Sequence, residues 1–325
     1  IYTLLDPEFY HAFLLYNQLN PHQPLWLMQE IWPEEEPHGD DYLATDYQAE
    51  YELEIEHVID AIHGNATIAE RRGRAWGTYT SDVSPYVIGY LVGRELEPHE
   101  VEVTDLLNEG FSFNGSYIQT TPEATPTEGW LAASLDYVLE YQERTYGWQH
   151  PVAIVNWPTL DPMDHPSERN EDGLKINESN DRITVDINNL QPGPLLKAGL
   201  FGAYHIYPNY PDFMNNNPHY DLYEDDHGRF RYGGYLQEFM ELHTAYPAVV
   251  AEFGLATGMG NAHTSPDGYH HGSMTEEVQG TGIVRLFEAM RNEGYAGGII
   301  FEWMDEWAKK TWTTEPYMIP YDRHI

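Results

Sequence analysis

Short apolar runs separated by loops and helical patterns are the feature of this chain that most limits its fold. Most of the runs are nearly continuous stretches of β-branched, aromatic or leucine residues, without strict alternation. Strands that are buried on both faces of a parallel sheet have this composition. The runs predict seven strands, at residues 1–5, 24–31, 86–92, 151–156, 200–206, 248–252 and 298–303.

Helical patterns lie between these strands. Asp6 followed by Pro7 predicts a helix start, with the aspartate as its cap and proline at the first helical position. Further apolar stripes, each stopped by a glycine, predict helices at 51–62, 131–142 and 284–290. Strands that alternate with helices indicate βαβ units and a parallel sheet.

The fold predicted from this alternation is α/β, a closed (β/α)8 TIM barrel. Such a barrel needs eight strands, and because the chain begins inside a predicted strand, we expect the first barrel strand upstream of Ile1 or missing. The alternative is a doubly wound open sheet, which usually carries a GxGxxG phosphate turn after its first strand. No such turn occurs in the sequence. Residues 1–325 are therefore predicted to form one barrel domain, and we expect it to be excised from a longer multidomain protein.

The charge balance excludes two classes of partner. The chain holds 53 acidic and 16 basic residues, a formal net charge of −37. Nucleic acids and anionic membrane surfaces both require Lys and Arg clusters, so we expect neither partner, and no run of about 18 apolar residues predicts a membrane span. The acidic residues are spread evenly, which favours a surface adapted to high salt over a local calcium site. The absence of cysteine excludes disulfides, thiolate metal sites and a cysteine nucleophile.

Polar and aromatic side chains end most of the predicted strands. In barrels the active site forms at the carboxyl ends of the strands, so these side chains are expected to converge on one rim. Paired carboxylates cleave glycosidic bonds, one as acid and the other as nucleophile or base, and tryptophan faces stack on sugar rings. The strand-end residues are Gln29, Trp32, Arg94, Glu95, Asn156, Trp157, His205, Tyr207, Glu252 and Trp303.

The sequences around two of these strand ends resemble those of a known family. The segments AVVAEFGLATG and YLVGRELEP are similar to the ends of the seventh and fourth strands in retaining glycoside hydrolases of the (β/α)8 superfamily that includes cellulases and β-galactosidases. The resemblance implies that Glu252 is the nucleophile and Glu95 the acid/base. His205 and Tyr207 match a His-x-Tyr motif whose tyrosine steadies the nucleophile, and Trp303 matches a tryptophan that floors the sugar site.

The sequence departs from the family pattern near the acid/base. Arg94 stands where the family usually has asparagine, so the substrate's 2-hydroxyl is held by another residue or by Arg94 itself. Glu97 lies two residues beyond Glu95 and is the alternative acid/base. The segments LDPMDHPSE and YPNYPDFM resemble a less characterised branch that is often part of cell-surface polypeptides, which implies an extracellular or cell-surface location. The tail 312–325 looks like a connection to an appended domain.

The remaining strand ends support hydrogen bonding and stacking with a β-glycan substrate. We expect Gln29 and Asn156 to bond sugar hydroxyls, and Trp32 and Trp157 to stack on sugar rings. Glu302 and Glu306 are alternative catalytic carboxylates, but the favoured interpretation is that Glu302 contacts sugar or supports the site and that Asp305 and Glu306 lie in the following loop.

No metal or cofactor is expected. A polar turn is favoured over a metal site for Asp161, Asp164 and His165, and a mobile lid is favoured for His270 and His271. The sequence thus predicts a retaining glycoside hydrolase. The alternatives are a transglycosylase with the same site, a non-catalytic glycan-binding barrel and a metal-dependent barrel hydrolase.

Overall fold

The computed structural model describes residues 1, 3–165 and 183–304. The chain divides into two compact units. The first comprises residues 1–156 and 185–202, and the second comprises residues 157–184 and 203–325. Strand β8 (Leu200–His205) contributes its first three residues to the first unit and its last three to the second.

The sheet of the first unit consists of parallel strands. Its order is β1 (Leu27–Ile31), β4 (Val87–Val92) and β6 (Val152–Asn156), with β8 next to β6. Tyr90 is in register with Gln29 on one side and with Val152 on the other. The almost continuous burial of these strands explains why the sequence runs are apolar on both faces.

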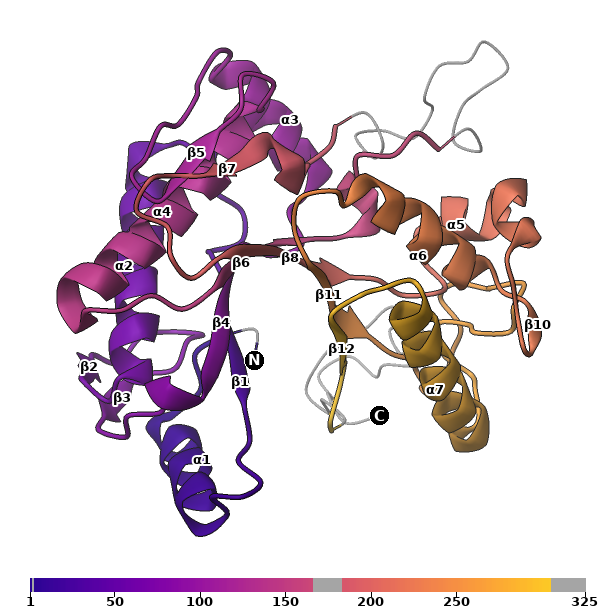
Figure 1. Cartoon of the computed structure of the whole chain (residues 1–325), viewed down its shortest axis with the longest axis horizontal. Helices are drawn as coiled ribbons and strands as arrows, with labels where there is room; N and C mark the ends of the chain where they lie inside the picture. Colours follow the sequence, from indigo (N-terminus) through magenta and orange to yellow (C-terminus); the bar gives the residue numbers. More distant parts are fainter. Residues whose placement is uncertain (2, 166–182, 305–325) are drawn as a thin grey trace. The chain divides into compact units, whose positions relative to one another are not determined.

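Helices α2 (Thr45–Ile62) and α4 (Pro126–Tyr146) lie beside this sheet (Figure 1). Trp130 of α4 is buried and stacks on Tyr42 with ring centroids 4.7 Å apart. Thr125 and Glu128 form a reciprocal capping box at the start of α4, and Gly147 ends that helix in the left-handed conformation. The other elements of the unit are α1 (Pro7–Leu19), α3 (Pro98–Leu107) and the antiparallel pairs β2 (Ala66–Ile68) with β3 (Gly77–Tyr79) and β5 (Ile118–Thr120) with β7 (Leu190–Pro192).

The second unit continues from β8 to β11 (Ala248–Phe253) and the parallel strand β12 (Gly297–Ile300). Helices α6 (Arg231–Leu242) and α7 (Glu276–Asn292) pack with these strands around one apolar core that includes Phe239, Val250 and Leu286. A short helix, α5 (Asp212–Asn216), and a small hairpin, β9 (Glu224–Asp225) with β10 (Gly228–Arg229), complete the unit. Short 3-10 turns occur in the two units at His38–Asp40, Ser84–Tyr86, Pro158–Leu160, Ile187–Asn189 and Pro218–Leu222.

The structure confirms an α/β fold with a parallel sheet and six of the seven predicted strands. The predicted strand at 1–5 is wrong, because none of its described residues is in a strand. Ile1 nevertheless forms two backbone hydrogen bonds with β1. Its amino group donates to the Met28 carbonyl oxygen, and its carbonyl oxygen accepts from the Glu30 amide. The last strand ends at Ile300, so Trp303 lies beyond it. Asp6 occupies the N-cap of α1 without the expected side-chain hydrogen bond.

Several carboxylates of this acidic chain accept hydrogen bonds from tyrosine hydroxyls rather than from lysines. The sequence has 25 tyrosines, and its lysines are scarce. Hydroxyl-to-carboxylate hydrogen bonds join Tyr42 to Glu100, Tyr137 to Glu56, Tyr141 and Tyr146 to Asp60, Tyr207 to Glu252, Tyr223 to Glu293 and Tyr235 to Asp161. Within the described ranges, no helix is both long and apolar enough to cross a membrane.

Candidate active site

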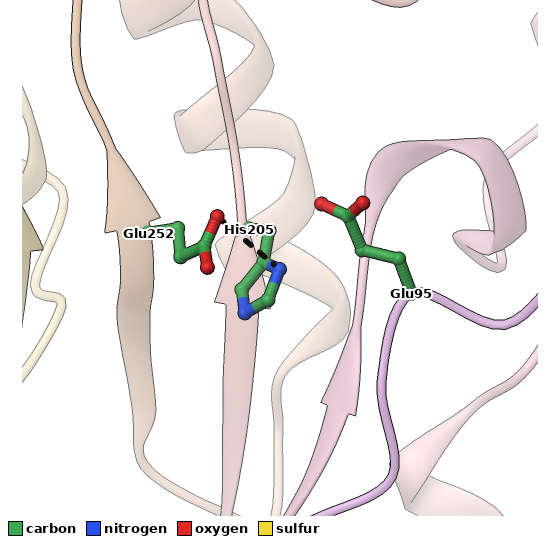
Figure 2. Close-up of side chains that lie close together, drawn as sticks. All are labelled: Glu95, His205 and Glu252. Carbon is green, nitrogen blue, oxygen red and sulfur yellow. Dashed lines mark ion pairs between the residues drawn. The ribbon is translucent and has the colours of Figure 1, made fainter. Parts of the chain in front are cut away.

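The loop after β4 carries Glu95, and a tyrosine from α2 fixes the end of that strand. The Tyr51 hydroxyl donates to the Ile31 carbonyl oxygen at 2.6 Å and accepts from the Gly93 amide at 3.0 Å. It therefore ties the end of β1 to the end of β4. Gly93 has a φ of +104°, which favours glycine. This conformation turns the chain out of the strand into the loop that bears Glu95 (Figure 2).

Arg94 stabilises this loop from within the first unit. Its guanidinium donates to the Glu100 carboxylate at 2.6 Å and to the Glu95 carbonyl oxygen at 2.8 Å. Glu100, on α3, also accepts from the Tyr42 hydroxyl at 2.5 Å. Both charged side chains are almost fully buried, so each provides the countercharge that the other needs. The expected contact of Arg94 with a sugar hydroxyl stays a prediction.

Glu95 and Glu97 occupy different environments. Glu95 is half-buried, whereas Glu97 is exposed and lies at the N-cap of α3. Desolvation raises the pKa of Glu97 above its usual value, Arg94 opposes this shift, and the neighbouring Glu100 and Glu95 carboxylates add to it. Glu95 is the less exposed of the two residues, which suits a group that transfers a proton away from bulk water.

The other candidate residues of the first unit differ in their burial and in the hydrogen bonds that they form. Gln29 is fully buried: its amide donates to the carbonyl oxygens of Thr3 and Glu30, and its oxygen accepts from Tyr10. Asn156 is buried at the end of β6 and donates to the Val185 carbonyl oxygen at 2.9 Å. Trp32 is half-buried, and its carbonyl oxygen accepts from Arg74. In this arrangement Gln29 and Asn156 support the strand ends.

The second unit brings three of the predicted residues together. Glu252 lies near the carboxyl end of β11, and the Tyr207 hydroxyl donates to its Oε2 at 2.8 Å. His205, at the end of β8, places its Nδ1 3.6 Å from the same oxygen (Figure 2). The Ile206 amide donates to the Glu252 carbonyl oxygen at 2.9 Å, which sets the register of the two segments. Oε2 of Glu252 therefore accepts a hydrogen bond from the neutral hydroxyl of Tyr207 and lies beside the imidazole of His205.

The glycine after this carboxylate has a steric role. A Cβ at Gly254 would lie 2.1 Å from the carbonyl oxygen of Phe301, in the segment that follows β12. The Phe301 amide also donates to the Phe253 carbonyl oxygen at 2.8 Å. The Glu-Phe-Gly sequence therefore lets the backbone after β12 pass directly over the strand end that holds Glu252.

The two tryptophans of the second unit are placed differently. Trp157 is half-buried, and its ring centroid lies 6.2 Å from that of Tyr210. Trp303 is 95% exposed, three residues beyond the end of β12. A tryptophan that stands in solvent is not packed as a fixed floor, so the floor role of Trp303 stays a prediction. Glu302 is also exposed, while Asp305 and Glu306 lie outside the described residues.

Asp161 and His165 form a buried pair. His165 Nε2 lies 2.9 Å from Asp161 Oδ1, and Asp161 Oδ2 accepts from the Tyr235 hydroxyl at 2.9 Å. The Met163 amide also donates to Asp161 at 2.9 Å, and the His165 ring stacks on Phe213. These contacts make the segment a hydrogen-bonded turn that is fastened to α6, in agreement with the polar turn expected from the sequence.

The loop between β11 and α7 is organised by its own backbone. The Ala262 amide donates to the His271 carbonyl oxygen, and the His271 amide donates to the His263 carbonyl oxygen. His270 accepts from the Ser265 amide at 3.0 Å. The sequence patterns indicated His270 and His271 but not His263, whose ring is nearly parallel to that of His271 with the two centroids 5.9 Å apart. Tyr210 was also not predicted, although the repeated tyrosine in Tyr-Pro-Asn-Tyr was an available signal for it.

A metal ligand set is not complete within the second unit. His205 and Glu252 offer one imidazole nitrogen and one carboxylate oxygen, fewer than the three protein ligands of a catalytic zinc site. Within the described part of this unit alone, no His, Asp and Glu side chains form a compact group of three.

Comparison with known proteins gives weak matches. No family model and no curated protein sequence matches the chain. A β-glucuronidase structure from Bacteroides uniformis is 11% identical with a TM-score of 0.40, covering 92% of this chain and 28% of that one. A calcium-binding mutant of β-glucuronidase 2 from the same organism is 12% identical with a TM-score of 0.42, covering 89% and 25%. A β-glucosidase from Exiguobacterium marinum is 11% identical with a TM-score of 0.43, covering 92% and 69%. The chain spans about a quarter of the two glucuronidase chains, and at these TM-scores the likeness does not establish a shared fold.

Proposed function

We propose that this chain is a retaining β-glycoside hydrolase built on a (β/α)8 barrel, with residues 1–325 as one catalytic domain. The observation that carries the proposal is the environment of Glu252: a carboxylate near the end of a parallel strand, held by the Tyr207 hydroxyl at 2.8 Å and flanked by His205. A carboxylate held in this way is oriented for attack, because its contacts with Tyr207 and His205 fix the direction in which it points. Glu95 on the loop after β4 provides the second carboxyl group that glycoside cleavage requires.

In the proposed first step, Glu252 attacks the anomeric carbon of the sugar. The bond between that carbon and the leaving oxygen breaks, and Glu95 gives its proton to the departing oxygen. In the second step, Glu95 accepts a proton from water, and the water oxygen displaces Glu252 from the anomeric carbon. Glu252 leaves as the carboxylate, and the product keeps the configuration of the substrate. The mechanism requires the two carboxyl groups to be about 5–5.5 Å apart.

The test follows both the rate and the stereochemistry. Glu252→Gln should lower turnover of an aryl β-glycoside by about 1,000-fold or more with the unfolding temperature unchanged. Glu241→Gln, at an exposed position of α6 in the same unit, is the matched control and should retain full activity. Proton NMR of the first product formed by the wild type should show the β-anomer. Formation of the α-anomer, or a carboxyl separation above about 7 Å in an experimental structure, would refute the retaining mechanism.

The assignment of the acid/base is tested separately. Glu95→Gln should impair substrates with poor leaving groups far more than activated aryl glycosides, because only the poor ones need protonation. Glu97→Gln should have little effect on either class. The reverse result would assign the role to Glu97. Full activity in the presence of a chelator is expected, and its loss would favour metal-dependent hydrolysis.

We also propose that the protein acts outside the cell or at its surface, in a saline medium. The location rests on the resemblance of two segments to cell-surface polypeptides, and the support for the saline medium is compositional: a net charge of −37 on an aromatic-rich chain. Dense carboxylates repel one another at low ionic strength, and salt screens that repulsion. An activity optimum below about 0.2 M salt would count against the saline medium.

A further inference from the structure

One cavity of the first unit is lined by three of the chain's 16 basic residues. Its volume is about 240 Å³, and its walls come from α2, from the segment that joins β2 to β3 and from the residues after β1. We call it the arginine cavity. Its charged lining includes Arg71, Arg72, Arg74, Glu34, Glu50 and Glu54.

Glu54 holds two of the arginines in place from α2. Its side chain is only 7% exposed, and the Arg71 guanidinium donates to both of its carboxylate oxygens. Arg74 Nη1 lies 3.2 Å from Oε1 of the same carboxylate. Burial by itself would raise the pKa of Glu54, but its contacts with the neighbouring imidazole and guanidiniums lower that pKa from the usual 4.5 to about 2. Two guanidiniums therefore share one ionised carboxylate, which leaves one positive charge in excess.

The excess charge of this cluster is met by an exposed carboxylate. Arg74 Nη2 donates to Glu34 Oε2 at 2.8 Å, and the Glu34 side chain is 53% exposed. An ion pair in such contact with water contributes little to stability. The oxyanion of a ligand can therefore take the place of the Glu34 carboxylate at little cost, and it finds Arg74 already oriented by Glu54.

Arg72 adds a charge that the protein itself does not use. It is exposed, and within the part of the chain that the structure describes it forms no hydrogen bond or ion pair. Glu50 is exposed as well, so the arginine cavity opens to solvent. The three arginines balance the three glutamates of the lining, so its formal charge is zero in a chain whose net charge is −37. An anion is repelled less here than by the acidic surface as a whole.

We propose that the arginine cavity is a binding site for an oxyanion, which is a phosphate, sulfate or carboxylate group. Arg72 and Arg74 hold its oxygens, because guanidiniums donate paired hydrogen bonds to such groups. A water molecule takes about 30 Å³ in the liquid, so the cavity also has room for part of the molecule that carries the group. Binding at this site does not depend on cleavage of a glycan.

The first test is calorimetric titration of the whole chain with inorganic phosphate and with sulfate, at an ionic strength held constant with NaCl. At least one of these ions should bind at one site per chain. Arg72→Gln and Arg74→Gln should each weaken that binding by about 5-fold or more. Arg144→Gln is the matched control, because this exposed arginine of α4 lies outside the cavity lining, and it should leave the affinity unchanged.

Removal of the displaced carboxylate gives a second test with the opposite sign. Glu34→Gln should strengthen binding by about 2-fold or more, because the oxyanion no longer competes with a charge. Glu52→Gln removes the same charge from an exposed position of α2 outside the cavity lining and should have no effect. Equal strengthening by both variants would assign the effect to overall charge and overturn the site.

A third titration distinguishes a free ion from an acidic group on a sugar chain. Its probes are a trisaccharide of galacturonate and the neutral trisaccharide of galactose. If the acidic trisaccharide binds more tightly than phosphate and sulfate, and Arg72→Gln removes this advantage, the site takes a sugar carboxylate; if it binds less tightly, the site takes a small free ion. Unchanged affinity in Arg72→Gln, or no binding of phosphate, sulfate or the acidic trisaccharide, would overturn the proposal.

Discussion

The Tyr207 hydroxyl donates to Oε2 of Glu252 at 2.8 Å, across the neighbouring ends of β8 and β11. A hydrogen bond to a charged group is worth about 1.5–3 kcal/mol. If Glu252 is the nucleophile, Tyr207→Phe should lower kcat by about 10- to 100-fold, because the carboxylate loses its orientation. Steady-state kinetics should show KM for an aryl glycoside little altered. An unchanged kcat would show that this bond does not position the nucleophile.

Gly254 should tolerate no larger residue. Gly254→Ala would place a Cβ 2.1 Å from the Phe301 carbonyl oxygen, and overpacking of this kind costs about 1–3 kcal/mol or more. Gly280→Ala is the matched control, because it lies at an exposed position inside α7 and an added Cβ would meet no atom within 4 Å. That change should stabilise by about 0.5–1 kcal/mol. Urea unfolding measures both, and equal effects would contradict the steric role of Gly254.

Glu128 makes the stability of the first unit depend on pH. Burial raises its pKa from the usual 4.5 to about 7, although the amides of Asp186 and Thr125 and the Asn189 side chain donate to it and oppose the shift. The folded state therefore keeps a proton that the unfolded chain has already lost, and the free energy of unfolding falls as pH rises from about 4.5 to about 7. The loss should reach about 3 kcal/mol.

Urea unfolding of the wild type and Glu128→Gln at pH 5 and pH 8 tests this. Because glutamine does not titrate, the decline with pH should be smaller in the variant. The same decline in both proteins would assign it to other groups.

The buried pair of Arg94 and Glu100 should matter for folding. Arg94→Leu leaves the Glu100 carboxylate buried with the Tyr42 hydroxyl but without its arginine, a change that costs about 3–5 kcal/mol. The double variant Arg94→Leu with Glu100→Leu should recover much of this loss, since no unpaired charge remains. Denaturant unfolding of the four proteins gives the coupling energy. Additive losses would show that the two charges do not depend on each other.

The stability that a tyrosine–carboxylate hydrogen bond contributes should depend less on salt than the stability that a lysine–carboxylate ion pair contributes. The Tyr146 hydroxyl donates to Asp60 at 2.6 Å, whereas exposed Lys197 pairs with Glu143. Tyr146→Phe should cost about 1 kcal/mol at both 0.1 M and 2 M KCl, because a neutral donor is not screened. Lys197→Met should cost little at 0.1 M and nothing measurable at 2 M. Thermal unfolding at both salt concentrations makes the comparison, and a Tyr146 effect that vanishes in salt would disprove it.

Local sequence patterns predicted the inner strands well, because strands such as β4 and β6 are buried on both faces and therefore uniformly apolar. Residues 1–5 have the same composition, but among those of them that the structure describes only Ile1 forms backbone hydrogen bonds with β1, and composition does not reveal how far pairing extends. Helix α6 was missed because Gly233 and Gly234 interrupt the stripe formed by Tyr232, Tyr235, Leu236 and Phe239.

The residues of the candidate site could be predicted only where they lie at the end of a predicted strand. Glu252 and Tyr207 could be named because each lies at or just after the end of an apolar run, and their contact is observed. The partner of Arg94 is Glu100, six residues away on a helix that the sequence patterns did not predict. The contact between Tyr210 and His263 was not predicted, because His263 lies on a loop whose course depends on its own backbone hydrogen bonds.

The tyrosine-to-carboxylate bonds have a consequence for how this surface meets its solvent. A lysine that binds a carboxylate cancels its charge, whereas a tyrosine fixes the side chain in place and leaves the full negative charge outside. Asp60, with two tyrosine donors, is thus ordered but still an anion that can attract water and cations. The chain can therefore hold these acidic side chains in defined positions while it keeps their negative charge, at the cost of the few water contacts that the tyrosine hydroxyls replace.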